Sequence, residues 1–326
     1  MKAIVCHELS GPAALRLEDV PEPCPGLGQV RVRVRACGVN FADSLITRGQ
    51  YQLQPQPPFS PGFEVAGEVL ELGAGVTGIA VGDRVIGMTG HGGYAEQAVI
   101  DANRCVAMPA AMPFAHGAAF PVVFGTSHIA LWHRARLQAG ETLVVHGASG
   151  GVGLTAVAIG KQLGATVIAT ASSSEKLDVA RQHGADYLIN SHTEDLRAQI
   201  KALTGGRGAD VVYDPVGGDL FSASLRSIAF EGRILVIGFA GGTVPQIPAN
   251  HLLVKNVDVI GVNWPAYAEH NPLMMTASFC ILMDWYLTGA IKPHLSATYP
   301  LEQAVEALHQ VITRQSTGKV VITVSD

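Results

Sequence analysis

The sequence predicts an α/β protein in which a doubly wound parallel sheet is joined to a second, mostly β unit. Three observations support this fold class. Short apolar runs alternate with segments of helical periodicity between residues 141 and 262, and a glycine-rich turn joins the first run to the first helix. Residues 1 to 122 instead hold short strands separated by Gly, Pro and Asp turns. At 326 residues the chain exceeds a typical single domain, so two domains are expected.

The stretch ETLVVHGASGGVGLTAVAIGKQLGA, residues 141–165, organises the rest of the chain. Residues 142–146 are apolar and rich in β-branched side chains, as expected for a buried strand. Glycines follow, and then Leu154, Val157 and Leu163 recur at helical spacing. A strand, a glycine turn and a helix in this order form a dinucleotide-binding unit, because the backbone must turn tightly and approach a pyrophosphate at the helix N-terminus.

The glycine spacing in this turn is G-x-x-G-x-x-G rather than G-x-G-x-x-G, so an ordinary βα turn is the alternative interpretation. The strand and helix that flank the turn favour cofactor binding. The residues expected to contact the cofactor here are Ser149, Gly150, Gly151, Val152 and Gly153.

The segments after this turn continue the alternation of strands and helices. Strands are expected at residues 165–170, 186–189, 210–213, 233–237 and 257–262, and helices at 174–183, 193–203 and 219–228. Six strands connected by helices predict a parallel sheet covered on both faces.

The first 122 residues follow another pattern. Residues 30–36 (VRVRVRA) alternate strictly, as a half-buried antiparallel strand does, and further short strands are expected at 64–72, 84–87 and 94–100. The last stretch holds two helices, at 277–287 and 301–313, and a strand at 319–324. We therefore expect one domain from residues 1–122, completed by 265–326, and a second from 123–264.

Composition excludes several classes of function. The net charge is −5 without a basic run, which argues against nucleic acid or anionic lipid as a partner. No stretch of 18 uninterrupted apolar residues and no signal-peptide pattern occurs, so a soluble, cytoplasmic protein is expected. The five cysteines are scattered without a C-x-x-C pair, which supports neither a disulfide framework nor a cysteine-rich zinc site.

Seven segments together carry a resemblance to a known family: HGASGGVG, ACGVNFADSLITRGQY (36–51), PGFEVAGEV (61–69), VGDRV (81–85), GGYAE (92–96), DPVGGDLF (214–221) and GKVVI (318–322). In their order along the chain they resemble the quinone oxidoreductase (zeta-crystallin-like) branch of the medium-chain dehydrogenase/reductase superfamily. The resemblance implies a GroES-like barrel domain, a Rossmann domain that binds NADP(H), and a homodimer.

The resemblance also indicates which metal ligands are missing. Zinc alcohol dehydrogenases of this superfamily place a cysteine ligand where this chain has Asn40 and a histidine ligand where it has Phe63. An amide and a phenyl group do not bind zinc, and the carboxylates of Glu64 and Asp43 alone make a poor zinc site. We therefore expect no metal.

Without a Lewis acid, oxidation of an alcohol is difficult, whereas hydride addition to a quinone or an enone needs only hydrogen bonds to the oxygen that gains charge. The resemblance places Asn40 and Tyr51 in the pocket, where both can donate to such an oxygen and Asn40 also faces the cofactor. Tyr51 can deliver a proton, as water can. The alternatives are a loop-capping amide for Asn40 and an aromatic at the pocket rim for Tyr51. Asp43 is expected to orient its neighbours.

The choice of cofactor is read after the second strand of the parallel sheet, where NAD enzymes place an acid. Residues 170–176 read TASSSEK, without an acid at 170–172, and Ser173 and Lys176 can bind a 2′-phosphate. This pattern predicts NADPH. The alternative is an N-cap serine and a solvated lysine. Asn190 lies where some relatives continue with a tyrosine that holds the phosphate, but here Ser191 follows.

Further cofactor contacts are expected from one helix and from loops at the carboxyl ends of later strands. By resemblance Thr126 lies near the nicotinamide ribose, with a helix N-cap as the alternative. Gly238 permits close backbone approach, and Phe239 either covers the nicotinamide or packs in the core. Asn263 lies in the last of these loops.

These expectations lead to one principal function and two alternatives. The principal function is zinc-independent, NADPH-dependent reduction of a small-molecule quinone or α,β-unsaturated carbonyl. The first alternative is reduction of an enoyl thioester such as an enoyl-CoA. The second is an NADPH-binding protein of low turnover with a structural or sensing role.

Overall fold

A computed structural model describes residues 1–325. The chain forms two compact units, Val123–Lys292 and a unit that combines Met1–Val122 with the segment from Pro293 onward. The first boundary coincides with the one expected from the sequence. The return to the first unit, expected at residue 265, is corrected to Pro293, because helix α10 (Pro272–Leu287) packs within the second unit. There its Ser278 Oγ lies 2.8 Å from His128 Nδ1, and its Phe279 ring packs edge-on against Trp264.

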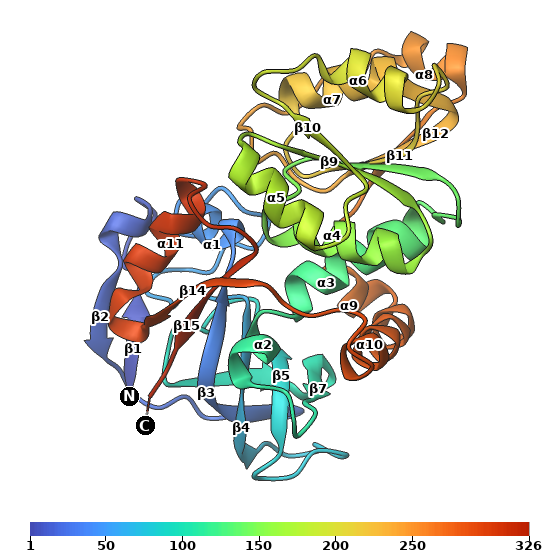
Figure 1. Ribbon diagram of the computed structural model, residues 1–326. Coiled ribbons are helices and arrows are strands. Elements are labelled where there is room, and N and C mark those ends of the chain that lie inside the picture. The colour runs from blue at the N-terminus through green and yellow to red at the C-terminus, as the bar shows by residue number, and fades with distance from the viewer. Residues whose placement is uncertain (326) are drawn as a thin grey trace. The chain divides into compact units, whose positions relative to one another are not determined.

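The second unit is built on a six-stranded sheet in which every pairing is parallel (Figure 1). Its strands are β8 (Thr142–Val145), β9 (Thr166–Ala171), β10 (Tyr187–Asn190), β11 (Ala209–Asp214), β12 (Ile228–Val236) and β13 (Asp258–Gly261). The order is β10-β9-β8-β11-β12-β13. This order reverses between β8 and β11, which makes their carboxyl ends the switch point where ligands of such sheets bind. The predicted doubly wound sheet is confirmed.

Helices cover both faces of this sheet, as apolar strands buried on two sides require. They are α4 (Gly151–Gln162), α5 (Ser174–Gln182), α6 (Leu196–Leu203), α7 (Gly218–Ser227) and α8 (Ala249–Lys255). The same unit holds α3 (Pro121–His128) from Val123 on, a π-helical turn (Ile129–Arg134), α9 (Tyr267–His270) and α10. Every residue of β8 is buried, in agreement with its unbroken run of apolar and β-branched side chains.

The first unit is mostly β, as its alternating sequence predicts. A seven-stranded sheet joins β3 (Gln29–Val39), β4 (Glu64–Leu72), β5 (Arg84–Met88), β6 (Gln97–Asp101), β7 (Cys105–Ala107), β14 (Leu295–Pro300) and β15 (Lys319–Thr323). Strands β1 (Lys2–Val5) and β2 (Arg16–Asp19) pair separately. In β3 the valines at 30, 32 and 34 are buried in the core, while the arginines between them are not.

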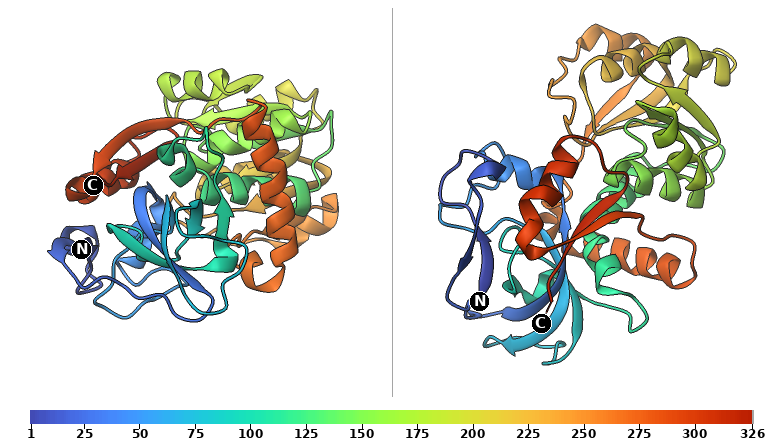
Figure 2. Two further views of the ribbon diagram at one scale, coloured as in Figure 1. Left: turned by 90° about the horizontal axis from the view of Figure 1, so that it is seen from below. Right: turned by 60° about the vertical axis from the view of Figure 1, so that its left-hand side comes forward.

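The end of the chain enters this sheet beside a strand from its beginning. Strand β15 pairs antiparallel with β3, with Val320 opposite Val39, and the red and blue strands lie together in Figures 1 and 2. This register places Lys319 next to the end of β3, where Asn40 follows. The helices of the unit are α1 (Phe41–Ile46), α2 (Phe114–Ala118) and α11 (Ala304–Ile312), with 3-10 turns at Pro12–Ala14, Ala102–Arg104 and Leu301–Gln303.

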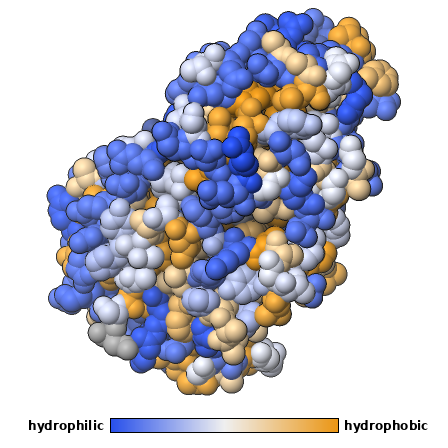
Figure 3. All heavy atoms as spheres, viewed as in Figure 1, coloured by the Kyte–Doolittle hydropathy of each residue, from blue (hydrophilic) through white to orange (hydrophobic). Residues whose placement is uncertain are grey.

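The surface is of mixed polarity, and the cysteines are unpaired, as their scattered positions predict. Figure 3 shows one face of the molecule, on which hydrophilic residues are mixed with smaller groups of apolar ones. All five cysteines are free thiols, at positions 6, 24, 37, 105 and 280. Among residues 1–325, none of the helices combines the length and the hydropathy that crossing a bilayer requires.

Candidate functional site

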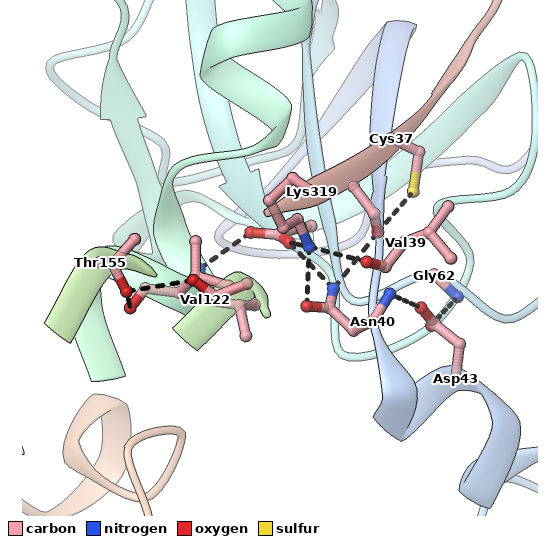
Figure 4. A network of polar contacts seen from close by, with 12 residues as sticks. Cys37, Val39, Asn40, Asp43, Gly62, Val122, Thr155 and Lys319 are labelled. Atoms are coloured by element: carbon pink, nitrogen blue, oxygen red, sulfur yellow. Dashed lines mark hydrogen bonds and ion pairs between the residues drawn. The ribbon is translucent and has the colours of Figure 1, made fainter. Parts of the chain in front are cut away.

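Asn40 and Asp43 fix the turn between β3 and α1 (Figure 4). Asn40 precedes the first residue of α1, and its backbone N–H donates to Asp43 Oδ2 at 2.7 Å. Asp43 also accepts from the Tyr94 hydroxyl and from the Gly62 N–H, each at 3.0 Å. Burial raises the pKa of Asp43 to about 7, and the hydrogen bonds and the nearby lysine oppose a further rise. Asp43 therefore holds three separate segments of the chain together.

Both the nitrogen and the oxygen of the Asn40 amide have hydrogen-bond partners, and the residue is only 8% exposed. Its Nδ2 donates to Glu64 Oε1 at 2.9 Å and to the Gly38 carbonyl at 3.3 Å, and its Oδ1 accepts from Lys319 Nζ at 2.8 Å. An amide has only two N–H donors, and here both have partners within the first unit. This geometry corresponds to the loop-holding alternative for Asn40 rather than to a free donor.

Glu64 and Lys319 form a buried ion pair at the centre of this cluster. Lys319 Nζ donates to Glu64 Oε1, Val39 O and Asn40 Oδ1, each at 2.8 Å. The other carboxylate oxygen, Glu64 Oε2, accepts from the Val122 N–H at 2.8 Å. The Glu64 side chain is fully buried and that of Lys319 is 4% exposed. Such a pair is stable only when hydrogen bonds satisfy the remaining donors and acceptors, as they do here.

Tyr51 differs from its neighbours because its hydroxyl has no hydrogen-bond partner among residues 1–325. Its ring is half-buried and packs edge-on against Phe63, with centroids 5.2 Å apart. Burial and, next, the charge of Asp43 raise the pKa of Tyr51, so the hydroxyl keeps its proton at neutral pH. Of the predicted catalytic residues in this unit, Tyr51 is the one with a donor to offer a ligand.

The donor set of this cluster does not fit a zinc ion. Within residues 1–325 no group of three or more His, Cys, Asp or Glu side chains is arranged to hold a metal. Glu64 already pairs with an ammonium, and Asp43 already accepts three hydrogen bonds. Burial raises the pKa of the nearby Cys37 thiol well above its ordinary value, which disfavours the thiolate that zinc requires.

In the second unit the glycine turn lies at the carboxyl end of β8, where α4 begins. Gly147 has a φ of 54°, a left-handed conformation that suits glycine. A Cβ added to Gly153 would lie 2.1 Å from the Gly147 carbonyl oxygen, so helix and turn approach as closely as glycine alone permits. Gly150 is the N-cap of α4 and no side chain caps the helix. The first turn of α4 therefore presents its N–H groups to a ligand at the sheet's switch point, which fits a pyrophosphate.

The other residues predicted to contact the cofactor lie in this turn and at the start of α4. Ser149 is buried within the turn, and Gly151 and Val152 form the first turn of α4. The Val152 carbonyl accepts from Ser127 Oγ at 3.0 Å, which ties α4 to the α3 segment.

His146 directly precedes the turn, and both of its ring nitrogens contact neighbouring elements of the unit. Its Nδ1 lies 3.0 Å from Thr170 Oγ1 and its Nε2 lies 2.7 Å from Ser224 Oγ. Burial lowers the pKa of His146, so the ring is neutral and links β8 to β9 and α7. After β11, Asp214 Oδ1 accepts from the N–H groups of Val216 and Gly217 and shapes the opposite side of the switch point.

The predicted phosphate-binding residues lie at the start of α5 and the end of β10. Ser173 is the N-cap of α5, and its Oγ accepts from the Lys176 N–H at 3.4 Å. The capping alternative for Ser173 is thus present, and Lys176 lies in the first turn of the same helix. Asn190 ends β10, and its Oδ1 accepts from the His192 N–H at 3.0 Å.

The remaining cofactor candidates lie on one helix and two loops. Thr126 is buried inside α3 near its end, so the N-cap alternative for Thr126 is wrong. Phe239 is 41% exposed, so its core alternative is wrong as well. A Cβ on Gly238 would lie 3.5 Å from Pro215 O, an ordinary contact, and Asn263 is exposed. These loops follow β12 and β13 at the carboxyl edge of the sheet.

Sequence reasoning missed Lys319, Tyr94 and His146 as members of these clusters. A lysine at the head of the apolar run KVVIT was the one signal for Lys319, since burying a lysine requires a partner. Nothing local to Tyr94 or His146 indicates their partners, which are distant in sequence.

Comparisons with known proteins agree with both units. The profile described as "Alcohol dehydrogenase GroES-like domain" matches residues 26–110, and that described as "Zinc-binding dehydrogenase" matches residues 151–278. "Quinone oxidoreductase-like protein 2" of Rattus norvegicus is 42% identical over 323 residues, which cover 99% of this chain and 92% of the relative.

Two solved structures show the same fold over nearly the whole chain. Escherichia coli quinone oxidoreductase complexed with NADPH has a TM-score of 0.92 and 30% identity, covering 99% of this chain and 100% of that one. The CurK enoyl reductase has a TM-score of 0.90 and 26% identity, covering 99% of each chain. The predicted resemblance is confirmed: the chain belongs to the quinone oxidoreductase family of the medium-chain dehydrogenase/reductase superfamily.

Proposed function

We propose that this protein is a zinc-independent, NADPH-dependent oxidoreductase that reduces quinones or α,β-unsaturated carbonyls. The observation that carries the proposal is the buried Lys319–Glu64 pair, in which the ammonium takes up a fully buried carboxylate that a zinc ion would otherwise need. Chemistry at this site then depends on hydrogen bonds rather than on a Lewis acid. Metal analysis of the dialysed protein tests this directly, and one tightly held zinc per chain that is needed for turnover would contradict it.

NADPH binding is supported by the backbone cradle at residues 147–153 and by the E. coli relative, whose structure holds NADPH. When bound, the reduced nicotinamide supplies a hydride. Gly151, Val152 and Gly153 bind the pyrophosphate through backbone N–H groups, with Ser149 and Gly150 beside them; the Gly150 N–H itself donates to Gly147 O at 2.9 Å. Thr126, Asn190, Gly238, Phe239 and Asn263 are proposed as further cofactor contacts. Asn40 is proposed as a packing contact only, because both of its amide N–H donors are used within the first unit.

Lys176 is proposed to select the phosphorylated cofactor. Replacing it by alanine removes a cation from the first turn of α5, which follows β9, and no acid stands at residues 170–172 to bind a ribose hydroxyl. We expect Lys176→Ala to raise the KM for NADPH by roughly tenfold, because a charge-assisted hydrogen bond is lost, and to leave the KM for NADH unchanged. Steady-state kinetics with both cofactors measures this, with Lys292→Ala, an exposed lysine of the same unit, as control. An unchanged preference would make Lys176 only a surface charge.

Tyr51 is proposed to hold a proton near the acceptor oxygen. Its hydroxyl is protonated at neutral pH and is not used by neighbours in the described chain. We expect Tyr51→Phe to lower kcat by roughly ten- to a hundredfold, which is at or below the low end of general acid catalysis, because water can substitute. The dissociation constant of NADPH, measured by fluorescence titration, should stay the same. Full activity of Tyr51→Phe would show that the Tyr51 hydroxyl donates no proton and that the ring only lines the pocket.

A panel of acceptors separates the candidate functions. NADPH oxidation is followed with a naphthoquinone, a simple enone and an enoyl-CoA, beside an NADPH titration. The likeness to the CurK enoyl reductase is the observation that favours the enoyl-thioester alternative, and turnover confined to the enoyl-CoA would establish it. Tight NADPH binding without turnover of any acceptor would instead indicate a structural or sensing role.

A homodimer is also proposed, formed through the second unit. Strand β13 ends the parallel sheet and leaves an unpaired edge, and large apolar side chains nearby are exposed: Phe230 at 66%, Leu253 at 77% and Val254 at 73%. Light scattering should give twice the monomer mass of 34.2 kDa. The free cysteines support a reducing compartment, for which we propose the cytoplasm.

A further inference from the structure

Lys319 is a buried cation whose three N–H donors are all used. The whole residue, backbone included, is 3% exposed. Its Nζ lies 2.8 Å from each of three oxygens, on Val39, Asn40 and Glu64. An ammonium has no donor beyond three, so this group has none left for an acceptor molecule or a cofactor. A role in the reaction must therefore pass through the groups that it holds.

The position of Lys319 follows from the pairing of two distant strands. Because β15 is antiparallel to β3 with Val320 opposite Val39, Lys319 lies across from the last residues of β3. Figure 4 shows its ammonium beside Asn40 and Val39. The Glu64 carboxylate oxygen Oε1 lies 2.8 Å from the same nitrogen. A residue seven positions before the end of the sequence thus contacts three residues that lie between positions 39 and 64.

The first consequence concerns the Asn40 amide. With an ammonium against Oδ1 and a carboxylate against Nδ2, only one of the two amide orientations is favourable. The backbone N–H of the same residue is held by Asp43 at 2.7 Å. The turn 38–43 is therefore fixed from both the side chain and the main chain, and it leads through α1 to Tyr51.

The second consequence concerns the start of α3. Glu64 uses its other oxygen, Oε2, to accept from the N–H of Val122, in the first turn of that helix. This N–H has no partner within the helix, and a carboxylate also interacts favourably with the positive end of the helix dipole. Glu64 can offer this oxygen as a charged acceptor because Lys319 neutralises the carboxylate in the interior.

We propose that Lys319 is a positioning residue for the reduction, which acts through Glu64 and Asn40 to hold the turn 38–43 and the first turn of α3 in the reactive arrangement. The kinetic part of this proposal rests on the proposed function. The structural part does not, because it concerns the ligand-free protein.

The test compares Lys319→Met, the double variant Glu64→Gln with Lys319→Met, and the control Lys2→Met, which makes the same change at an exposed strand position of the first unit. Lys319→Met leaves a buried unpaired carboxylate, so its Tm should fall. The double variant removes both charges, and its Tm should recover most of that loss. The double variant therefore keeps the proposal testable if the single variant folds poorly.

Two readouts distinguish positioning from stability. Hydrogen exchange of ligand-free protein should become faster in segments 38–43 and 121–124 of both Lys319 variants, and not in Lys2→Met. In the double variant kcat should stay at least roughly tenfold below wild type, as for a misplaced reacting group, while the NADPH dissociation constant stays within about twofold. Recovery of both Tm and kcat in the double variant, or unchanged exchange in both segments, would overturn the proposal. If the wild-type protein reduces no acceptor, the proposed function is wrong. The hydrogen-exchange rates alone then decide whether Lys319 holds these two segments.

Discussion

Gly153→Ala is expected to abolish NADPH binding, with an affinity loss of about a hundredfold or more. The new Cβ would lie 2.1 Å from Gly147 O and 2.8 Å from Ala148 Cα, and both are backbone atoms that cannot rotate away. Helix α4 must then move off the glycine turn, and its first N–H groups lose their position at the switch point. Overpacking of this kind also costs roughly 1–3 kcal/mol of folding free energy.

A fluorescence titration with NADPH measures the loss, and urea unfolding measures the stability. Gly261→Ala is the matched control, because a Cβ at that glycine of the same unit meets nothing within 4 Å. The control should bind NADPH as the wild type does. If Gly153→Ala retained affinity within about threefold, the close seat of α4 on the turn would not be what binds the nucleotide.

The second large effect is expected at Asp43. Asp43→Ala leaves three buried donors without an acceptor: the N–H groups of Asn40 and Gly62 and the Tyr94 hydroxyl. Each unsatisfied buried group costs roughly 1–3 kcal/mol, so we expect a total loss of about 4 kcal/mol in the free energy of unfolding. Activity should fall as well, because the turn that carries Asn40 loses its support. Asp19→Ala, at an exposed position, should change stability by less than about 0.5 kcal/mol.

The same residue makes a prediction about pH. Burial raises the pKa of Asp43 from 3.8 to about 7, so the folded protein binds a proton that the unfolded chain has released between these values. A raised carboxyl pKa means that the stability contributed by protonation is complete below pH 3.8 and is lost as pH rises toward 7. The unfolding free energy of the wild type should therefore decline across this window, and the decline should be smaller in Asp43→Ala. Equal pH slopes in the two proteins would contradict the assignment.

Local signals in the sequence were sufficient for much of the second unit. The strands from β8 to β13 are short, apolar and separated by helical periodicities, and a parallel sheet needs both features. The glycines at 147, 150 and 153 indicated the turn, because a close approach of two backbones excludes any side chain. The predicted return to the first unit at residue 265 was wrong because the composition of helix α10 did not indicate against which unit it would pack.

The residues of the first unit's cluster show where local signals end. The sequence placed Asn40, Asp43 and Tyr51 near the same site through the family resemblance, but it did not indicate how their hydrogen bonds are distributed. That distribution depends on Lys319 and Tyr94, which reach the cluster through strand pairing and loop packing over long separations. Whether a donor is available to a ligand depends on every acceptor that lies near it. In the folded chain both amide donors of Asn40 have such acceptors, so Asn40 holds the turn.

The sequence by itself determined the doubly wound sheet, the glycine cradle and the family, because each is carried by residues that are close together in the chain or by motifs in a set order. Only the tertiary structure decided that Lys319 neutralises Glu64, that Asn40 has no free donor, and that residues 265–292 belong to the second unit. The physical reason is that burial and hydrogen-bond satisfaction are set by contacts between distant segments, and these exist only once the chain has folded.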